Sequence, residues 1–262
     1  MVDDRNTTET LNRLDGLNRT MGVVERRRGL HYWLGFEYAL AVQLLNVPHG
    51  CRILDIGSGS WSIWPYVLAH IFEAEVTALD LAPDFSRQKE RRERAVAAGL
   101  CRRDQVHLVR ADARQLPFDD GTFDAATSIS SLEHVEGLAG DRTALKEACR
   151  VLRSGSTMII SMPFRAEGSM AELDAQMSLY QRHYSEKTLA ASMIEPSGFE
   201  ECARVYYGES WPMYKTLSLV PKAIQQAVRP WNAKLSKRFM RLCPDAAGAS
   251  AVMLRLKKPQ AK

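Results

Sequence analysis

The sequence predicts an α/β fold, a doubly wound and mostly parallel sheet of about seven strands with helices on both faces. Short apolar segments alternate along the chain with longer segments of helical periodicity, which is typical of strands joined by crossover helices. The first apolar segment, ILDI at 53–56, stops at Gly57-Ser58-Gly59, where glycine tolerates positive φ and lets a ligand approach the backbone. With 262 residues, 45% of them hydrophobic, the chain is long enough to bury one substantial core.

The order of the predicted elements follows from these patterns. The first 20 residues are polar and predict a mobile segment or a loosely packed helix, and a lid helix follows at 21–45. Strands are predicted at 53–56, 75–80, 106–110, 123–129, 156–162, 201–207 and 251–256. Helices are predicted to start near residue 62, to span 83–98, to end at 151–155 and to span 186–194. We therefore expect an N-terminal segment with the lid helix at 1–47 and a main domain at 48–262.

Acidic residues at three strand ends predict a nucleoside-binding site. Asp80 follows the glycines by about 20 residues, the position that binds ribose hydroxyls in doubly wound folds. Asp55 is placed to accept a hydrogen bond from a cationic or amine group, and Asp112 to accept one from an adenine amino group. Because ligands of open α/β sheets bind at the carboxyl ends of the strands, these carboxylates are expected to face one adenosine-type ligand.

Five ordered motifs support this interpretation: DIGSG at 55–59, DL at 80–81, DA at 112–113, LEHV at 132–135 and RVLRSG at 150–155. Their order resembles that of the class I S-adenosylmethionine-dependent methyltransferases that act on small molecules, over residues 48–208. The resemblance implies a Rossmann-like fold, with S-adenosylmethionine as cofactor and S-adenosylhomocysteine as its product. It also implies the cofactor-binding residues, which are Asp55, Gly57, Ser58, Gly59, Asp80, Leu81, Asp112, Ala113 and Ser128.

One position departs from the family pattern. The family often carries a third glycine two residues after the second, and this chain has Trp61 there. An indole does not fit a position that only glycine fills, so we expect a longer loop and a helix that starts late. Ser62 or Ile63 is then near the helix cap, with Pro65 in the first turn, where a missing N–H is tolerated. Trp61 either packs over the cofactor pocket or makes an ordinary hydrophobic contact beneath the loop.

The implied reaction is methyl transfer to a small-molecule acceptor, with oxygen or nitrogen favoured as the methylated atom. A base is needed only for a hydroxyl or a protonated amine, and His134 is the first candidate, followed by Glu133. Either residue is also typical of a polar helix start that bonds to nearby backbone. The acceptor pocket is expected beneath 21–36, lined by some of His31, Tyr32, Trp33, Phe36, His183 and Tyr184, although aromatic residues at helical spacing also pack in cores.

A basic segment at 211–241, within a predicted helical insertion at about 209–246, contains no Asp or Glu. Apolar residues such as Trp231 and Phe239 are interleaved with its positive residues, which are Lys215, Lys222, Arg229, Lys234, Lys237, Arg238 and Arg241. One interpretation is peripheral contact with an anionic membrane or a lipid-linked substrate. The other is a capping helix pair whose apolar face packs on the core while its lysines face solvent. A nucleic-acid partner is disfavoured, because the net charge is only +4 and no recognition motif is present.

Other patterns narrow the class of protein. The polar start and the lack of a long apolar run argue against a signal peptide or membrane span, which favours a cytoplasmic protein. The cysteines and histidines show no metal-ligand spacing, so no metal is expected.

Two rival functions share parts of the pattern. One is a non-catalytic cofactor-binding protein that uses the basic insertion to bind a membrane or partner. The other is an NAD(P)-dependent oxidoreductase, which Ser62 at the last position of Gly-x-Gly-x-x-Gly disfavours. The sequence leaves the acceptor and the oligomeric state open.

Overall fold

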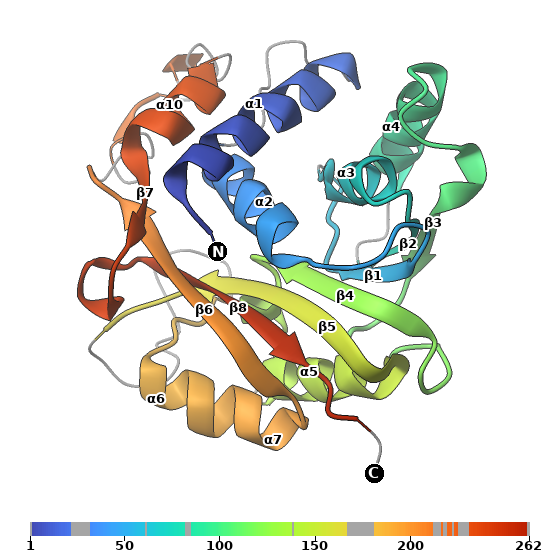
Figure 1. Ribbon diagram of the computed structural model, residues 1–262, viewed down its shortest axis with the longest axis vertical. Helices are drawn as coiled ribbons and strands as arrows, with labels where there is room; N and C mark the ends of the chain where they lie inside the picture. The colour runs from blue at the N-terminus through green and yellow to red at the C-terminus, as the bar shows by residue number, and fades with distance from the viewer. Residues whose placement is uncertain are drawn as a thin grey trace.

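The computed structural model describes residues 2–21, 32–60, 62–81, 85–137, 139–166, 181–211, 216, 219–221, 223–224 and 231–260. Within these ranges the strands form one eight-stranded sheet in the order β3-β2-β1-β4-β5-β8-β6-β7 (Figure 1). The strands are β1 (Arg52–Ile56), β2 (Glu75–Asp80), β3 (Val106–Arg110), β4 (Phe123–Ile129), β5 (Leu152–Pro163), β6 (Glu200–Glu209), β7 (Met240–Cys243) and β8 (Ala251–Lys257).

The sheet reverses its order at one point, which defines the ligand edge. Strands β1 to β5 pair in parallel, whereas β8 is antiparallel to both β5 and β6, and β7 is antiparallel to β6. The chain runs outward from β1 to β2 and β3, then returns to place β4 on the other side of β1. Open α/β sheets bind ligands outside the carboxyl ends of the strands at such a reversal. The glycine turn after β1 therefore lies at the expected ligand edge.

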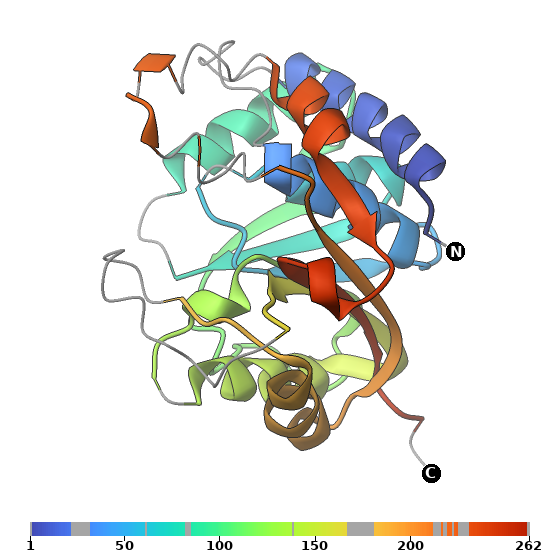
Figure 2. The same cartoon turned by 90° about the vertical axis from the view of Figure 1, so that its left-hand side faces the viewer.

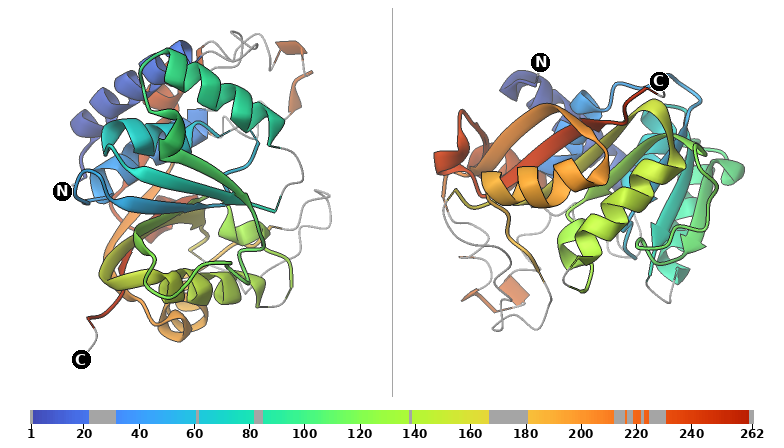
Figure 3. Two further views of the ribbon diagram at one scale, coloured as in Figure 1. Left: turned by 90° about the vertical axis from the view of Figure 1, so that its right-hand side faces the viewer. Right: turned by 90° about the horizontal axis from the view of Figure 1, so that it is seen from below.

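Helices cover both faces of the sheet, as the sequence predicted. One face carries α1 (Asp4–Thr20), α2 (Tyr32–Leu44), α3 (Trp64–Ile71), α4 (Ser86–Ala97) and α10 (Asn232–Phe239) (Figure 1). The other carries α5 (Gly140–Val151), α6 (Glu186–Thr188) and α7 (Glu195–Ser197) (Figure 3). A π-helical turn, η3 (Leu189–Ile194), joins α6 to α7, and short 3₁₀ turns are η1 (Arg103–Gln105), η2 (Leu132–His134) and η5 (Ala246–Gly248). Each face has its own apolar core, one including Leu40 and Trp64, the other Leu145 and Ile160.

Apolar periodicity located most of these elements correctly. β2, β3 and β4 have the predicted bounds, and β1 begins one residue earlier than predicted. Helix α3 starts late, with Ile63 as its N-cap and Pro65 in the first turn. The Ser62 hydroxyl accepts a hydrogen bond of 3.0 Å from the Trp64 N–H, so it satisfies a donor at the start of the helix. Trp61 itself lies outside the described residues.

The N-terminal segment is not the mobile or loosely packed element that its polar composition predicted. Leu11, Leu14 and Leu17 of α1 are buried at helical spacing along one face. Helix α1 packs against α2 and also contacts α10 (Figure 2). A narrow stripe of leucines is enough to anchor an otherwise polar helix. The predicted lid helix at 21–45 is described as α2 from Tyr32 onward, and 22–31 lie outside the described residues.

Two strand predictions also need correction. β5 begins at Leu152 rather than at 156, because Leu152 already pairs with Phe123 of β4 directly after α5 ends. The sheet also has one strand more than predicted, since part of the supposed helical insertion is β7. β7 pairs with the last residues of β6, a partner more than thirty residues away in the chain, as Tyr206↔Cys243 shows. A local pattern does not reveal such a pairing.

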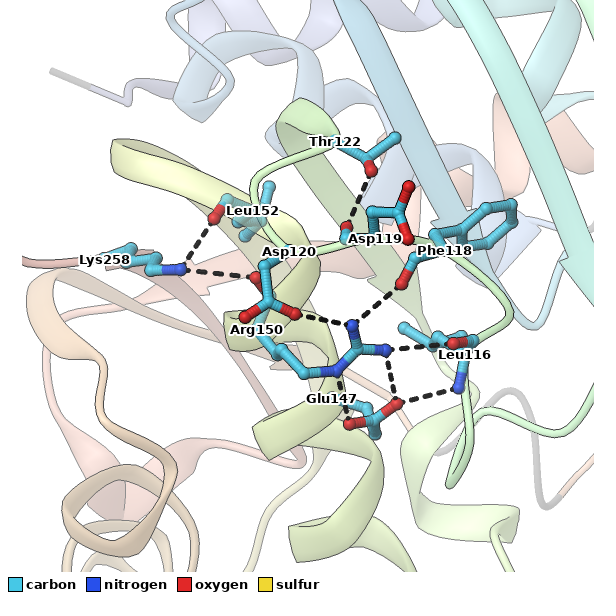
Figure 4. Close-up of polar contacts among 9 residues, drawn as sticks. All are labelled: Leu116, Phe118, Asp119, Asp120, Thr122, Glu147, Arg150, Leu152 and Lys258. Atoms are coloured by element: carbon cyan, nitrogen blue, oxygen red, sulfur yellow. Dashed lines mark hydrogen bonds and ion pairs between the residues drawn. The ribbon is translucent and has the colours of Figure 1, made fainter.

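Arg150, near the end of α5, fixes the connection between β3 and β4 (Figure 4). Its guanidinium donates hydrogen bonds of 2.8–2.9 Å to the carbonyl oxygens of Leu116 and Phe118 and to the carboxylates of Asp120 and Glu147. Lys258 Nζ donates in turn to the carbonyl oxygens of Arg150 and Leu152. The segment from Leu116 to Asp120 precedes β4, Arg150 precedes β5, and Lys258 follows the antiparallel β8, so all lie at the end of the sheet opposite the ligand edge. The RVLRSG motif therefore has a structural role here.

Candidate functional site

The glycine loop after β1 passes close to both neighbouring strands. Gly57 has φ +77°, and a Cβ on it would lie 1.6 Å from Ser131 Oγ, so only glycine fits beside the segment that follows β4. Gly59 has φ +62°, and a Cβ on it would meet no atom within 4 Å, so this residue borders open space. Its N–H donates a hydrogen bond of 2.7 Å to Asp80 Oδ2 at the end of β2. The loop thus forms an open cradle at the ligand edge.

Gln88 of α4 holds this loop from outside. Its buried side-chain amide donates hydrogen bonds of 2.6 Å to the Gly59 carbonyl and 3.0 Å to the Ser62 carbonyl. Tyr66 OH donates to the backbone carbonyl and to Oε1 of Gln88. Sequence analysis did not identify Gln88, although it is an uncharged residue in a strongly charged helix, which is a signal for an inward-facing position.

Asp55 lies beneath the loop with both carboxylate oxygens engaged. Ser58 Oγ donates to Oδ2 at 2.7 Å, and Thr127 Oγ1 donates to Oδ1 at 2.9 Å. Trp64 Nε1 donates to the same Thr127 hydroxyl at 3.0 Å, so the chain of bonds crosses from α3 through β4 to β1. Burial raises the pKa of Asp55 to about 6, even though the hydroxyl donors lower it. Ser58, a predicted cofactor residue, is buried and is bonded to Asp55 in this structure.

The remaining predicted cofactor residues lie in different environments. Leu81 is 60% exposed next to Asp80, an unusual state for a large apolar side chain beside a polar loop. Asp112 accepts hydrogen bonds from the Arg114 side chain, which lowers its pKa, and Ala113 is half-buried. Ser128 is fully buried, and its hydroxyl donates to the Ile56 carbonyl at 3.1 Å, so it links β4 to β1.

These residues fit an adenosine cofactor. The open cradle at Gly59 leaves room for a ligand that a Cβ would fill, and Asp80 stands at the strand end where ribose hydroxyls bind in such folds. The exposed Leu81 offers an apolar surface of the kind on which an adenine ring packs. Asp55, Gly57, Gly59, Asp80, Leu81 and Asp112 are the groups that would hold it.

Glu133 and His134 lie in η2, directly after β4. The Glu133 side chain is 1% exposed, and among the described residues its Oε2 has no hydrogen-bond partner. Burial, with a smaller contribution from the charge of Glu37, raises the pKa of Glu133 to about 8. His134 is more open, with a side chain 45% exposed and Nε2 3.8 Å from Glu133 Oε1. Both candidate bases are therefore at the ligand edge, in contrasting environments.

The backbone of this segment is clamped by Arg182. The Arg182 N–H donates to the Glu133 carbonyl at 3.1 Å, and the guanidinium donates to the carbonyls of Val135 and Gly137. Arg182 is itself buried beside Asp141, with Nε 3.5 Å from Oδ2. The loop that carries Glu133 and His134 is therefore held in place by a buried cation.

A buried acid that sequence analysis missed contacts the segment that leads into Glu133. Glu37 of α2 is fully buried, and Oε1 accepts hydrogen bonds from Trp33 Nε1 at 3.2 Å, from Ser130 Oγ at 3.0 Å and from Tyr207 OH. Ser130, with φ +48°, follows the end of β4 and also donates to Oε2 at 2.9 Å. Burial raises the pKa of Glu37, opposed by these donors. A single acid in the apolar run YWLGFEYALAVQL was the available signal.

The predicted acceptor residues separate into two groups. Trp33 and Phe36 meet at the Tyr207 ring, with ring centroids 6.0 and 5.8 Å away. His183 lines a different cavity, of about 450 Å³, with Phe164, Arg165 and Ser250, and the buried Tyr184 hydroxyl donates to Asp141 at 2.8 Å. His31 and the side chain of Tyr32 lie outside the described residues. The structure thus brings Trp33 and Phe36 to the ring of Tyr207, which bonds to Glu37, and brings Tyr184 to Asp141, the ion-pair partner of Arg182.

None of the described residues form a group of three or more His, Cys, Asp or Glu arranged to hold a metal ion. No helix within the described ranges has the length and apolar character needed to cross a membrane.

Comparison with known proteins gives concordant matches. Residues 54–160 match the family model described as a methyltransferase domain. The O-methyltransferase cnsE of Penicillium expansum is 37% identical over 117 residues, 45% of this chain and 40% of that protein. A demethylmenaquinone methyltransferase of Bacillus licheniformis is 29% identical over 177 residues, 64% of this chain and 68% of that protein. The crystal structure of the cyclase SpnF has the same fold, with a TM-score of 0.61 and 17% identity over 98% of this chain and 94% of its own.

The fold, the glycine loop and the domain match identify a class I S-adenosylmethionine-dependent methyltransferase fold. The methyltransferase domain match, residues 54–160, contains the glycine loop, Asp80 and Asp112. The resemblance inferred from the five motifs is thereby confirmed. The chain spans 40% of the length of the first relative and 68% of the length of the second. The matches therefore do not establish that it has the activity of either protein.

Proposed function

We propose that this protein is an S-adenosylmethionine-dependent methyltransferase that methylates a small-molecule acceptor. The observation that carries the proposal is the open glycine cradle at the sheet reversal, fastened to Asp80 and underlain by Asp55. The methyltransferase domain match covers these same residues. Relatives named as O-methyltransferase and demethylmenaquinone methyltransferase support a small-molecule acceptor.

Some residues of the site would bind the substrates, and others would accept a proton. When bound, the cofactor supplies an electrophilic methyl group, and S-adenosylhomocysteine remains after transfer. Asp80 and the Gly59 backbone would orient the adenosine end, while the segment after β4 faces the acceptor. Holding the reactants in line contributes several kcal/mol without any side chain touching a proton. Glu133 or His134 would take a proton where the acceptor is a hydroxyl or a protonated amine.

Calorimetric titration with S-adenosylhomocysteine tests the proposal, with NAD as a parallel ligand. We expect micromolar binding of S-adenosylhomocysteine and none of NAD. Binding of NAD alone would move the protein to the oxidoreductase class. Binding of neither would favour a fold used only for partner contact, and the proposal would be abandoned.

A second candidate is a cofactor-binding protein with another role, because SpnF shows that this fold also occurs in a protein named as a cyclase. Incubation with methyl-labelled S-adenosylmethionine and an acceptor library separates the two. Label in a small-molecule product supports methyl transfer. Tight cofactor binding with no labelled product from any acceptor supports the second candidate.

The basic segment at 211–241 supports a peripheral contact with anionic lipid, in an otherwise cytoplasmic protein. Four of its described apolar residues are exposed, namely Trp211 by 59%, Leu219 by 79%, Ile224 by 50% and Trp231 by 55%, whereas Leu235 and Phe239 are half-buried and Met240 is buried. Helix α10 packs on α1 and α2, so the capping interpretation also holds for that part, while Lys234 lies over the Trp231 ring at 4.6 Å. Co-sedimentation with phosphatidylcholine vesicles, with and without phosphatidylglycerol, tests the contact. We expect binding only with the anionic lipid, and loss of it in Trp231→Ser but not in Leu81→Ser.

A further inference from the structure

Two buried acids and three aromatic rings lie at the ligand edge, and methyl transfer alone does not require this combination. We call the group the acidic aromatic cluster, which consists of Trp33, Phe36, Glu37, Glu133 and Tyr207. Glu37 lies in its centre with donors from α2, β6 and the end of β4. Ser130, three residues before Glu133, donates hydrogen bonds to both Glu37 carboxylate oxygens, so Glu37 contacts the segment that leads into Glu133. Both are buried at the carboxyl ends of β4 and β5, where the ligand edge lies.

No buried cation neutralises these two acids in the described part of the chain. Asp141 is paired with Arg182, and Asp112 with Arg114, but no ion pair between described residues joins a lysine or arginine to Glu37 or Glu133. A buried carboxyl oxygen without a partner, such as Glu133 Oε2, destabilises the unliganded protein. Such a group is expected where a ligand donor completes the site.

The rings around the acids add a second feature. Trp33 and Tyr207 are inclined at 49°, and Phe36 and Tyr207 at 41°, so the rings form a tilted wall beside Glu37 rather than a stack. Trp33 remains half-buried, whereas Phe36 and Tyr207 are fully buried. Aromatic faces next to carboxylates are the combination that recognises ammonium groups, through cation–π attraction and charge-assisted hydrogen bonds.

We propose that the acidic aromatic cluster binds a protonated amine of the methyl acceptor, with Glu133 Oε2 as its hydrogen-bond acceptor and Glu37 as the second negative charge. This inference rests on the proposed function and narrows it to amine-bearing acceptors. The ammonium then gives one N–H proton to the Glu133 carboxylate, which becomes a carboxylic acid. The electron pair of that N–H bond stays on nitrogen, which is left neutral and nucleophilic.

Proton linkage gives the proposal a distinctive signature. Glu133, with a pKa of about 8, is mainly protonated at pH 7 in the free protein. A bound cation favours the carboxylate, so the carboxyl must release about one proton to the buffer. A neutral ligand of the same shape releases none.

The test uses the full chain saturated with S-adenosylhomocysteine and two matched probes, phenethylamine and 2-phenylethanol. Calorimetry at pH 7 in two buffers of different ionisation enthalpy measures affinity and proton release together. We expect phenethylamine to bind at least about tenfold more tightly than the alcohol, with release of about one proton. In Glu133→Gln the preference and the proton release should both disappear, while the exposed control Glu73→Gln should keep both.

The outcomes separate this inference from the proposed function. A phenethylamine affinity no higher than that of 2-phenylethanol, including no binding of either, overturns the inference while S-adenosylhomocysteine binding stands. Failure of S-adenosylhomocysteine to bind overturns the proposed function instead. If Glu133→Gln does not fold, the test uses the unchanged protein alone. A preference for phenethylamine with proton release then supports the inference, and the lack of either overturns it.

Discussion

The backbone N–H of Gly59 donates a hydrogen bond of 2.7 Å to the Asp80 carboxylate, so the loop after β1 is fastened to the end of β2. The Asp80 carboxylate therefore holds the loop in its conformation and also lies where ribose hydroxyls bind in such folds. Asp80→Ala is expected to weaken S-adenosylhomocysteine binding by more than about tenfold, since a charged contact contributes about 1.5–3 kcal/mol. Calorimetric titration of the variant measures this, with the exposed Asp104→Ala as control. Equal affinity in both variants would contradict the assigned site.

Gln88→Leu is expected to loosen the loop from the other side. The substitution leaves the carbonyls of Gly59 and Ser62 without their donor and removes the side-chain acceptor of the Tyr66 hydroxyl, which keeps its bond to the backbone carbonyl of residue 88. We expect S-adenosylhomocysteine affinity to fall by about tenfold and the unfolding temperature to drop, because buried groups lose their hydrogen bonds. Lys89→Leu, exposed on the same helix, should change neither quantity. A Gln88→Leu protein with unchanged cofactor affinity would show that Gln88 has only a structural role.

Asp55→Asn is expected to stabilise the unliganded protein at pH 8. The pKa of Asp55 rises from its ordinary 3.8 to about 6 on folding, so the folded state holds the proton more tightly than the unfolded state. The stability that this provides is fully present below pH 3.8 and is lost as the pH rises through about 6, a difference of roughly 3 kcal/mol. Thermal unfolding at pH 5 and pH 8 should show a gain for Asp55→Asn that grows with pH. A gain of equal size at both values would contradict the assigned titration.

Proton transfer to Glu133 predicts a pH dependence of kcat/KM. Because the carboxylate is the active form of a base, kcat/KM should rise about tenfold per pH unit below pH 8 and level off above it. Glu133→Gln should lower the rate and remove this rise. His134→Ala should keep the cofactor affinity and lower turnover. Persistence of the rise in Glu133→Gln, together with its loss in His134→Ala, would make His134 the base instead.

Arg150→Met is expected to destabilise the fold without changing the site. The variant loses bonds to two carbonyls and two carboxylates, of which Glu147 is itself bonded to the Leu116 N–H. A loss of about 3 kcal/mol corresponds to a fall in unfolding temperature of roughly 6–12 °C for a chain of this size. Differential scanning calorimetry measures it, with the exposed Arg103→Met as control. S-adenosylhomocysteine affinity at 20 °C should be unaltered, and a large change in it would place Arg150 in the cofactor site's support.

The fold was largely predictable because its signals are local. Apolar runs of four to seven residues ending at Asp80 or at the glycines give the parallel strands, and Pro65 gives the late start of α3. The strand β7 was missed because its existence depends on pairing with Tyr206 to Glu209 of β6. Helix α1 was judged by its polar average, whereas Leu11, Leu14 and Leu17 anchor it.

The site was predictable where residues follow strand ends and not where they meet across the fold. The Glu37 carboxyl contacts Ser130 and Tyr207, which lie 93 and 170 positions away in the sequence. Gln88 meets Gly59 in the same way, from another helix. Ser128 and Tyr184 show the converse, since their hydroxyls are engaged by Ile56 and Asp141. Residue type alone does not distinguish an inward contact of this kind from a ligand contact.

Helix α2 joins the two ends of the site through consecutive residues. Glu37 faces the acidic aromatic cluster, while Tyr38 forms a hydrogen bond of 3.0 Å with the Ser62 hydroxyl beside the glycine loop and stacks on Trp64. A shift of α2 on binding at one end would therefore displace the contacts at the other. Thermodynamic reciprocity requires the two effects to be equal, so any cofactor-induced change in acceptor affinity must be matched by the same factor in cofactor affinity. Coupling between cofactor and acceptor binding would then depend on the position of α2 and not on a single contact.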